Sequence, residues 1–198
     1  MHLDRVPYEL DAGPVRLRAW DPREVGVADL LFSVIDENRE FLGRFLPMTD
    51  RFHEPKDAVT FLRNTRARFE AMQDFLFGIW AKDEGRVTGR LVGGSALLVR
   101  GEPEAVGMEI GYWLREGETG KGFALAAAKT LAKLALEVGA QRVVVRCDPE
   151  NVASRKVAEK LGFVFEGVAR RSMRLREQAR DLAIYSLVPG EGAFERVD

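Results

Sequence analysis

Apolar and polar side chains alternate along this chain with two different periods, and each change of period marks an element. Residues 15–20, Val-Arg-Leu-Arg-Ala-Trp, alternate with a period of two, which predicts a first strand. Asp21-Pro22 then has the signature of a helix start, and apolar residues recur at helical spacing up to Asn38. A short second helix is predicted at 41–45, before Pro47.

The remaining segments predict a sheet with helices on both faces. After Glu54-Pro55, apolar residues from 58 to 72 have the three- and four-residue spacing of a helix. Later segments predict strands at 75–81, 91–99 and 106–114, a helix from 124 to Gly139, a strand at 141–147, a helix at 151–161, and strands at 163–167 and 182–188. Hairpin-spaced strands followed by strand–helix–strand units favour an α/β fold (α+β by some schemes) with a mixed sheet.

Length and composition indicate one globular domain. The chain has 198 residues, of which 46% are hydrophobic and 31% charged, so we expect a single domain over 1–198 with its core at about 14–190. Its 30 basic and 31 acidic residues leave no basic footprint for nucleic acid. We expect no membrane span and no signal peptide, since no apolar run is long enough for either. Cys147 is the single cysteine, so no internal disulfide can form, and we expect an inert thiol in a cytoplasmic protein.

A glycine-rich turn precedes the helix that begins near Phe123. Gly120 and Gly122 remove side chains that would obstruct a phosphate, and the helix start adds backbone N–H groups and the positive end of its dipole. The alternative is a tight corner with no ligand. A Rossmann or Walker A loop fits badly, since the third glycine of the first and the Gly-Lys-Ser/Thr ending of the second are absent.

A second polar turn, Asn151-Val-Ala-Ser154, opens the next helix. The Asn151 amide can donate to and accept from a ligand's amide groups, and the Ser154 hydroxyl can hydrogen-bond a sulfur or donate a proton to it. Helix capping is the competing interpretation for both residues. Lys156 and Lys160 fit solvated surface charges, with contact to a phosphate as the alternative.

The strand at 107–114 carries one carboxylate among apolar residues. Glu109 shares its face with Gly111 and Trp113, and a carboxylate buried there is costly without a role or a partner. Glu109 is therefore a candidate general base acting through a water. The alternative is an ion-paired or solvent-facing glutamate.

Taken together, these motifs resemble the GNAT superfamily of N-acetyltransferases. The resemblance rests on Glu109-Ile-Gly-Tyr-Trp-Leu114, Thr119-Gly-Lys-Gly-Phe-Ala124, and Asn151-x-x-Ser154 followed by Leu161-Gly-Phe163. Three further segments are similar to the ribosomal-protein (N-terminal) alanine acetyltransferase branch. They are Val15-Arg-Leu-Arg18 of the first strand, Asn38-Arg-Glu-Phe-Leu42, and Ile184-Tyr-Ser-Leu187 near the end. The resemblance covers nearly the whole chain and is not specific to a substrate.

The resemblance implies a mostly antiparallel seven-stranded sheet, splayed between its fourth and fifth strands, with acetyl-CoA in the gap. It also implies an amine that attacks the thioester directly, without a covalent enzyme intermediate. The implied cofactor contacts are the backbone of Tyr112, Trp113 and Leu114 and the side chain of Asn151 on the pantetheine arm, and Gly120, Lys121, Gly122, Phe123 and Ala124 on the pyrophosphate.

Two residues depart from the family pattern. Thr119 stands where the phosphate loop normally opens with Gln or Arg, and Ala158 stands where many relatives carry a tyrosine general acid. Ser154 or a water must then protonate the thiolate, unless no acid is needed, since a thiolate with a pKa of about 8.5 is already a tolerable leaving group.

The expected activity is acetylation of a primary amine, most plausibly a protein N-terminal α-amine. A pKa of about 7.7–8.0 leaves an α-amine substantially neutral near neutral pH, whereas lysine, at about 10.4, stays charged. The alternatives are a small amine acceptor (antibiotic, polyamine or amino acid) and a non-catalytic acyl-CoA-binding module. His2 and His53 lack partners at metal-ligand spacing, so no metal is expected. Homodimers are common in such families, although no exposed stripe here requires one.

Overall fold

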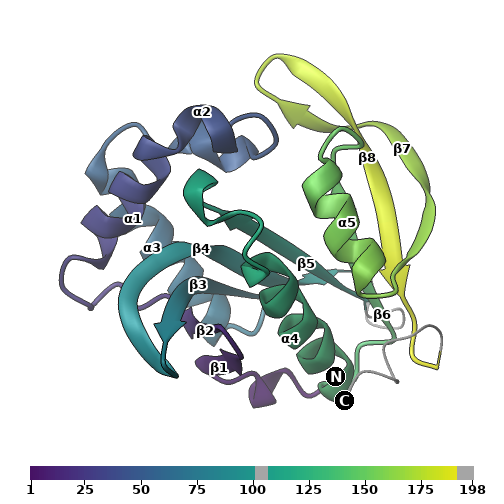
Figure 1. The fold of residues 1–198 in the computed structure, drawn as a ribbon, viewed down its shortest axis with the longest axis horizontal. Helices are drawn as coiled ribbons and strands as arrows, with labels where there is room; N and C mark the ends of the chain where they lie inside the picture. Colours follow the sequence, from purple (N-terminus) through teal and green to yellow (C-terminus); the bar gives the residue numbers. More distant parts are fainter. Residues whose placement is uncertain (101–106, 191–198) are drawn as a thin grey trace.

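One mixed sheet organises the molecule. The computed structural model describes residues 1–100 and 107–190, and within these ranges eight strands follow the order β1-β2-β3-β4-β5-β6-β8-β7 (Figure 1). β5 and β6 run parallel, and every other pair of neighbours described is antiparallel. The predicted mixed, mostly antiparallel sheet is therefore confirmed. The strands are β1 (Glu9–Ala12), β2 (Val15–Ala19), β3 (Asp74–Asp83), β4 (Arg86–Arg100), β5 (Gly107–Leu114), β6 (Arg142–Cys147), β7 (Val164–Leu175) and β8 (Gln178–Leu187).

The eighth strand is β1, which the sequence pattern did not predict. Its four residues are too few to show a period. A tight turn folds it back onto β2, because the Asp11 carboxylate accepts a hydrogen bond of 2.9 Å from the Gly13 N–H, and Gly13 adopts a left-handed φ of 67°.

Helices cover both faces of the sheet, as predicted. They are α1 (Val27–Glu37), α2 (Arg39–Leu42), α3 (Pro55–Glu70), α4 (Phe123–Glu137) and α5 (Val152–Lys160), with the 3₁₀ turns η1 (Leu3–Arg5), η2 (Pro47–Arg51) and η3 (Glu116–Glu118). The alanine-rich side of α4 packs with Ala158 of α5 in one large core on one face. The apolar side chains of α1 and α3 pack against Trp80 and Leu91 in a second core. These two helices lie on the other face of the sheet (Figure 1).

The predicted start of α1 was wrong. Asp21-Pro22 forms a turn in which the Asp21 carboxylate accepts bonds from both the backbone N–H and the guanidinium of Arg23. The helix begins five residues later, after Gly26 in the left-handed conformation. The start of α3 agrees with its Glu54-Pro55 signature, because the side chains of Glu54 and Asp57 form a reciprocal capping box.

The sheet divides at its parallel pair. β5 and β6 pair with each other only over Gly107–Glu109 and Arg142–Val144. Beyond these residues the two strands continue to Leu114 and Cys147 without pairing to each other. This is the central splay that was predicted between the fourth and fifth strands, counted from β2. Position 106, the first residue of the predicted 106–114 strand, lies outside the described residues. No helix in the part of the chain that the structure describes is both long and apolar enough to cross a membrane.

Candidate active site

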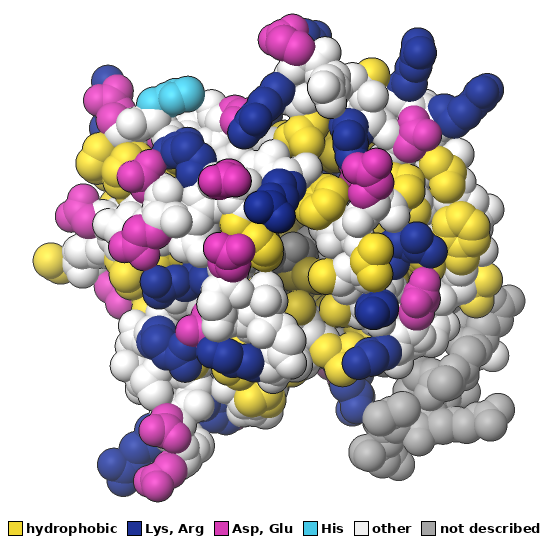
Figure 2. Space-filling model, turned by 45° about the horizontal axis from the view of Figure 1, so that its top comes forward, with side chains coloured by type: hydrophobic (Ala, Val, Ile, Leu, Met, Phe, Trp, Pro, Cys, Tyr) yellow, Lys and Arg dark blue, Asp and Glu magenta, His cyan; other side chains and the backbone are white. Residues whose placement is uncertain are grey.

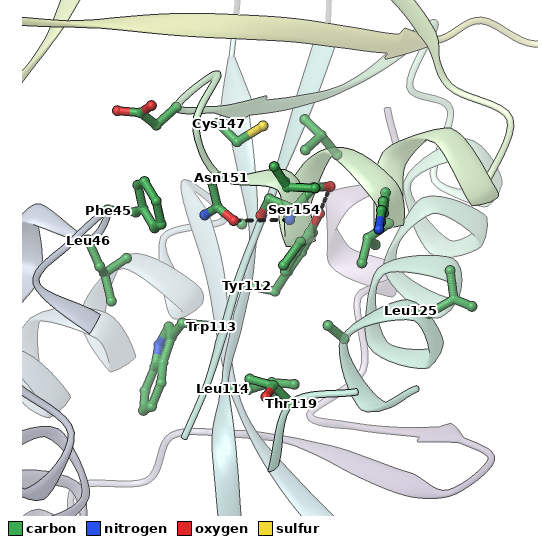
Figure 3. Close-up of a pocket in the computed structure, with 18 of the residues that line it drawn as sticks. Phe45, Leu46, Tyr112, Trp113, Leu114, Thr119, Leu125, Cys147, Asn151 and Ser154 are labelled. Atoms are coloured by element: carbon green, nitrogen blue, oxygen red, sulfur yellow. Dashed lines mark hydrogen bonds between the residues drawn. The ribbon is translucent and has the colours of Figure 1, made fainter. Parts of the chain in front are cut away.

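A cleft of about 610 Å³ opens where β5 and β6 diverge. Its walls come from β5, the turn before α4, the start of α5, the segment around α2, and the β7–β8 hairpin. A hollow near the centre of the face shown in Figure 2 is bordered by hydrophobic side chains. In Figure 3, Phe45, Leu46 and Trp113 lie on one side of β5, and Tyr112, Ser154 and Leu125 lie on the other. The cleft therefore reaches both faces of the sheet.

The turn before α4 presents open backbone to the cleft. Gly120 and Gly122 both line it in the left-handed conformation, with φ of 76° and 82°, and a Cβ at either position would meet no atom within 4 Å. Gly122 is the N-cap of the 15-residue α4. The backbone N–H groups of such a helix start have no helical partners, and the helix dipole favours an anion there. This geometry fits a phosphate group.

The two other polar residues of this turn make structural contacts. The Thr119 hydroxyl donates to the Glu116 carbonyl at 2.9 Å and closes the turn. Lys121, expected at the cofactor, is not among the cleft-lining residues, and its Nζ lies 3.0 Å from the Glu118 carboxylate. Burial alone would raise the pKa of Glu118, but the bonds from Arg90 and Lys121 hold that pKa below its ordinary value. The Lys121 ammonium is therefore held at Glu118, and the backbone of the turn is left to contact a ligand.

Asn151 and Ser154 lie at the start of α5, on the cleft. The Asn151 side chain accepts a bond of 3.1 Å from the Ser154 backbone N–H, so the capping interpretation holds for Asn151 (Figure 3). The Ser154 carbonyl accepts a bond of 3.0 Å from the Tyr112 hydroxyl of β5. Burial raises the pKa of Tyr112, which keeps this hydroxyl protonated and the bond across the gap intact.

The loop before Asn151 is held by a buried ion pair. Asp148, buried between β6 and α5, receives the Arg180 guanidinium of β8 at 2.8 Å, and Glu150 receives the same group at 2.5 Å. These contacts, led by the hydrogen bond to Asp148, raise the pKa of Arg180 above its ordinary value. The β7–β8 hairpin thus fixes the position from which Asn151 faces the cleft.

Glu109, the candidate base, lies outside the residues that line this cleft. Its Oε2 is 2.6 Å from Arg146 and 3.4 Å from Arg100, so it is the ion-paired glutamate of the alternative interpretation. Both contacts end on the same oxygen. Arg146 itself lines the cleft, and this places Glu109 one side chain away from it.

Sequence reasoning missed part of the cleft wall. Phe41 and Phe45 line the cleft, as do Met173 and Leu182 of the hairpin. The alternation of side chains in the last two strands did not indicate this contact with the cleft. It depends on the pairing of β8 with β6, which a local pattern does not show. Cys147 also lines the cleft, and burial raises the pKa of its thiol to about 11. Lys156 and Lys160, treated as surface charges, border the same space.

The end of α1 is joined to the segment before α4. Asn38, just after α1, accepts a bond of 2.9 Å from the Glu116 N–H and donates one of 2.8 Å to the Val34 carbonyl. Glu37 pairs with Arg115 at 3.1 Å. Among the described residues, no group of three or more His, Cys, Asp or Glu side chains is arranged to hold a metal ion.

Comparison with known proteins agrees with this fold and cleft. The family model described as "Acetyltransferase (GNAT) domain" matches residues 15–164. The ribosomal-protein-serine acetyltransferase of Escherichia coli K12 is 32% identical, over 80% of this chain and 85% of its own. The putative ribosomal N-acetyltransferase YdaF of Bacillus subtilis is 28% identical, over 92% of this chain and 95% of its own.

Among solved structures, the microcin C7 self-immunity acetyltransferase MccE, in complex with acetyl-CoA and AMP, superposes with a TM-score of 0.81. It is 21% identical, over 92% of this chain and 97% of that one, a likeness that establishes the fold. Fold and cleft thus define an acetyltransferase. The chain belongs to the GNAT family and is an N-acetyltransferase.

Proposed function

We propose that this enzyme transfers the acetyl group of acetyl-CoA to the N-terminal α-amine of a protein, by direct attack within a ternary complex. One observation carries the proposal. A single cleft joins an open glycine turn at a helix start, suited to phosphate, to a mouth lined by residues around α2 and of the β7–β8 hairpin. The donor would enter from the first end and the amine from the second.

The donor side offers backbone groups as its main contacts. Beyond Glu109, the edge of β5 that faces β6 has no ladder partner in the register described, so the N–H and C=O groups of Tyr112 to Leu114 can pair with pantetheine amides. Gly120 to Ala124 would hold the pyrophosphate, with Lys121 contributing its backbone. Asn151 would contact the pantetheine arm from the opposite wall.

The chemistry requires one proton to leave the amine and one to reach the sulfur. The neutral nitrogen forms a bond to the thioester carbonyl carbon, and the C–S bond then breaks with its electron pair on sulfur. Glu109 would accept the amine proton through a water, using Oε1, since Oε2 is occupied by the two arginines. The Ser154 hydroxyl would stabilise or protonate the departing thiolate. Base and acid roles of these two residues are part of the proposal.

An α-amine acceptor is supported by its ionisation and by the relatives. At a pKa of about 7.7–8.0 the α-amine needs little help to become neutral, which suits one carboxylate outside the cleft lining better than lysine at about 10.4 does. The two relatives named above are described as a ribosomal-protein-serine acetyltransferase and a putative ribosomal N-acetyltransferase. The cleft mouth is also lined largely by apolar side chains from α2 and the hairpin, which suits a chain end rather than a polycation.

The test measures thiol release from acetyl-CoA with a panel of acceptors. Serine- and alanine-first peptides with free N-termini should be acetylated. The same peptides with a blocked N-terminus and an internal lysine should not, and mass spectrometry locates the acetyl group. If polyamines, amino acids or aminoglycosides are turned over faster than every peptide, the acceptor is a small amine and not a protein N-terminus. Tight acetyl-CoA binding with no thiol release for any acceptor would indicate a binding module.

A further inference from the structure

A second hollow, of about 300 Å³, is lined by residues of β4, β5, β6 and β8. Arg100, Arg142 and Arg146 line it, with Glu109 beneath them. Among the described residues, those that line the hollow all lie on strands. The hollow is therefore a basic surface built on the sheet itself.

The arginines at this hollow and the carboxylates that pair with them differ in how much of each side chain is exposed. The carboxylates that pair with the arginines are less exposed than the arginines themselves: the side chains of Asp74, Glu109 and Glu166 are 9%, 15% and 33% exposed. The side chains of Arg100, Arg142 and Arg146 are 44%, 44% and 41% exposed. A guanidinium has five N–H donors, and one ion pair leaves several of them directed elsewhere. A ligand approaching from solvent therefore meets guanidinium groups first.

The hollow adjoins the cleft. Arg146 lines both, and Ile184, its register partner on β8, forms the adjoining floor. Farther along the sheet, Arg100, Gly107 and Arg142 lie side by side in register on three neighbouring strands. Gly107 has no side chain, so the floor is lowest between the two outer arginines. Arg146 follows Arg142 by four positions on β6, which corresponds to about 13 Å at about 3.3 Å per residue.

We propose that this row of arginines binds acidic side chains of the acceptor polypeptide as it leaves the cleft. The inference rests on the proposed function, because it places the acceptor's N-terminus at the cleft and its next residues along the sheet. The preferred acceptor is then a protein end with Asp or Glu at about its third to fifth residue. Carboxylates on guanidinium groups can form paired, charge-assisted hydrogen bonds, which a lysine-bearing tail cannot.

The experiment compares three serine-first hexapeptide amides on the full-length enzyme at low salt. One has alanine at all following positions, the second has glutamate at positions three to five, and the third has lysine there. We expect kcat/KM about tenfold higher for the glutamate than for the lysine peptide. The preference should fall to about threefold or less in 0.5 M NaCl, because exposed charges are screened.

Variants locate the preference. Arg142→Gln and Arg100→Gln should each lower kcat/KM for the glutamate peptide about three- to tenfold and reduce the glutamate-over-lysine ratio. Arg86→Gln is the matched control, since Arg86 is an exposed arginine at the opposite end of β4, and it should leave the ratio unchanged.

Two results separate this inference from the proposed function. Acetylation of the alanine peptide with equal rates for glutamate and lysine tails, or with lysine preferred, overturns the inference and leaves the N-terminal activity standing. A ratio that Arg142→Gln and Arg86→Gln change equally also overturns it. Failure of all three peptides, with turnover of a small amine, overturns both.

Discussion

At the scale of single residues, the cleft separates backbone roles from side-chain roles. Both hydrogen bonds that hold Ser154 in place use its backbone, as N–H to Asn151 and as carbonyl to the Tyr112 hydroxyl. The Ser154 hydroxyl takes part in neither of these bonds. Glu109, by contrast, is held by its side chain, between Arg146 and Arg100. Substitutions at these two positions therefore test different steps.

Ser154→Ala and Glu109→Gln should both lower turnover and leave acetyl-CoA affinity nearly unchanged. Ser154→Ala keeps the helix cap and the Tyr112 bond, so a loss of about tenfold would report the hydroxyl alone. Glu109→Gln should cost about 10- to 100-fold at pH 7. That loss should shrink as pH rises above 8, because the amine then loses its proton in solution.

These outcomes are measured as pH profiles of kcat and as calorimetric affinities for acetyl-CoA. Unchanged turnover of Glu109→Gln at neutral pH would remove Glu109 from the base role. A Ser154→Ala enzyme with full activity would mean that a water protonates the sulfur, or that no acid is needed.

The Cys147 thiol should be slow to react although it lines the cleft. Burial raises its pKa from 9.0 to about 11, which leaves about a hundredfold less thiolate at any pH below 9 than an unfolded chain has. Alkylation at pH 7.5 should be slower in the folded protein than in urea by at least that factor, and should accelerate up to about pH 11. Equal rates in the two states would contradict a buried neutral thiol.

At the scale of elements, the starts of α4 and α5 carry the cofactor assignment, and both were predictable. A glycine in the left-handed conformation and an asparagine cap are local signals, decided within about four residues. The start of α1 was not predictable in this way. Asp21-Pro22 has the signature of a helix start, but the Asp21 carboxylate bonds to Arg23 and forms an isolated turn instead.

Gly122→Val should abolish acetyl-CoA binding, with Gly26→Val as its control. Both glycines are N-caps with φ near 80° (82° and 79°), and a Cβ at either meets no atom within 4 Å, so the backbone strain of substitution is matched. The side chain at position 122 would project into the cleft, whereas position 26 precedes α1 and does not line it. Calorimetry should show at least about a hundredfold weaker binding for Gly122→Val only. Equal affinities would contradict the pyrophosphate placement.

At the scale of the whole molecule, the sheet consists of two parts joined by three residue pairs between β5 and β6. The fold class and the helices on both faces could be predicted from the sequence, because side-chain periods and turn motifs are local signals. The splay was implied by the resemblance of those motifs to a known family. The hairpin wall and the ion pairs of Glu109 could not be predicted. They depend on partners that lie far away in the sequence, such as Arg146 for Glu109 and Leu182 for the cleft mouth.

Acetyl-CoA bound across the splay should stabilise the fold, because its contacts would join the two parts. At a concentration one hundred times its Kd, a ligand adds about 2.7 kcal/mol to the free energy of unfolding. For a domain of this size that corresponds to a rise in Tm of about 5–10 °C. Thermal denaturation with and without acetyl-CoA measures it, with Gly122→Val as the variant that should show no rise. An unchanged Tm of the native chain would contradict binding across the gap.

The link between Asn38 and Glu116 has a consequence for how the two substrates influence each other. The bond fastens the end of α1 to η3, which precedes the glycine turn at the start of α4. Under the proposed function, α1 would lie beside the acceptor and the glycine turn would hold the pyrophosphate. Displacement of that turn by one ligand is then transmitted to the other ligand's wall, so their affinities share a coupling free energy that must be reciprocal. Calorimetry should show that CoA changes peptide affinity by the same factor as peptide changes CoA affinity, and that Asn38→Ala brings both factors close to one.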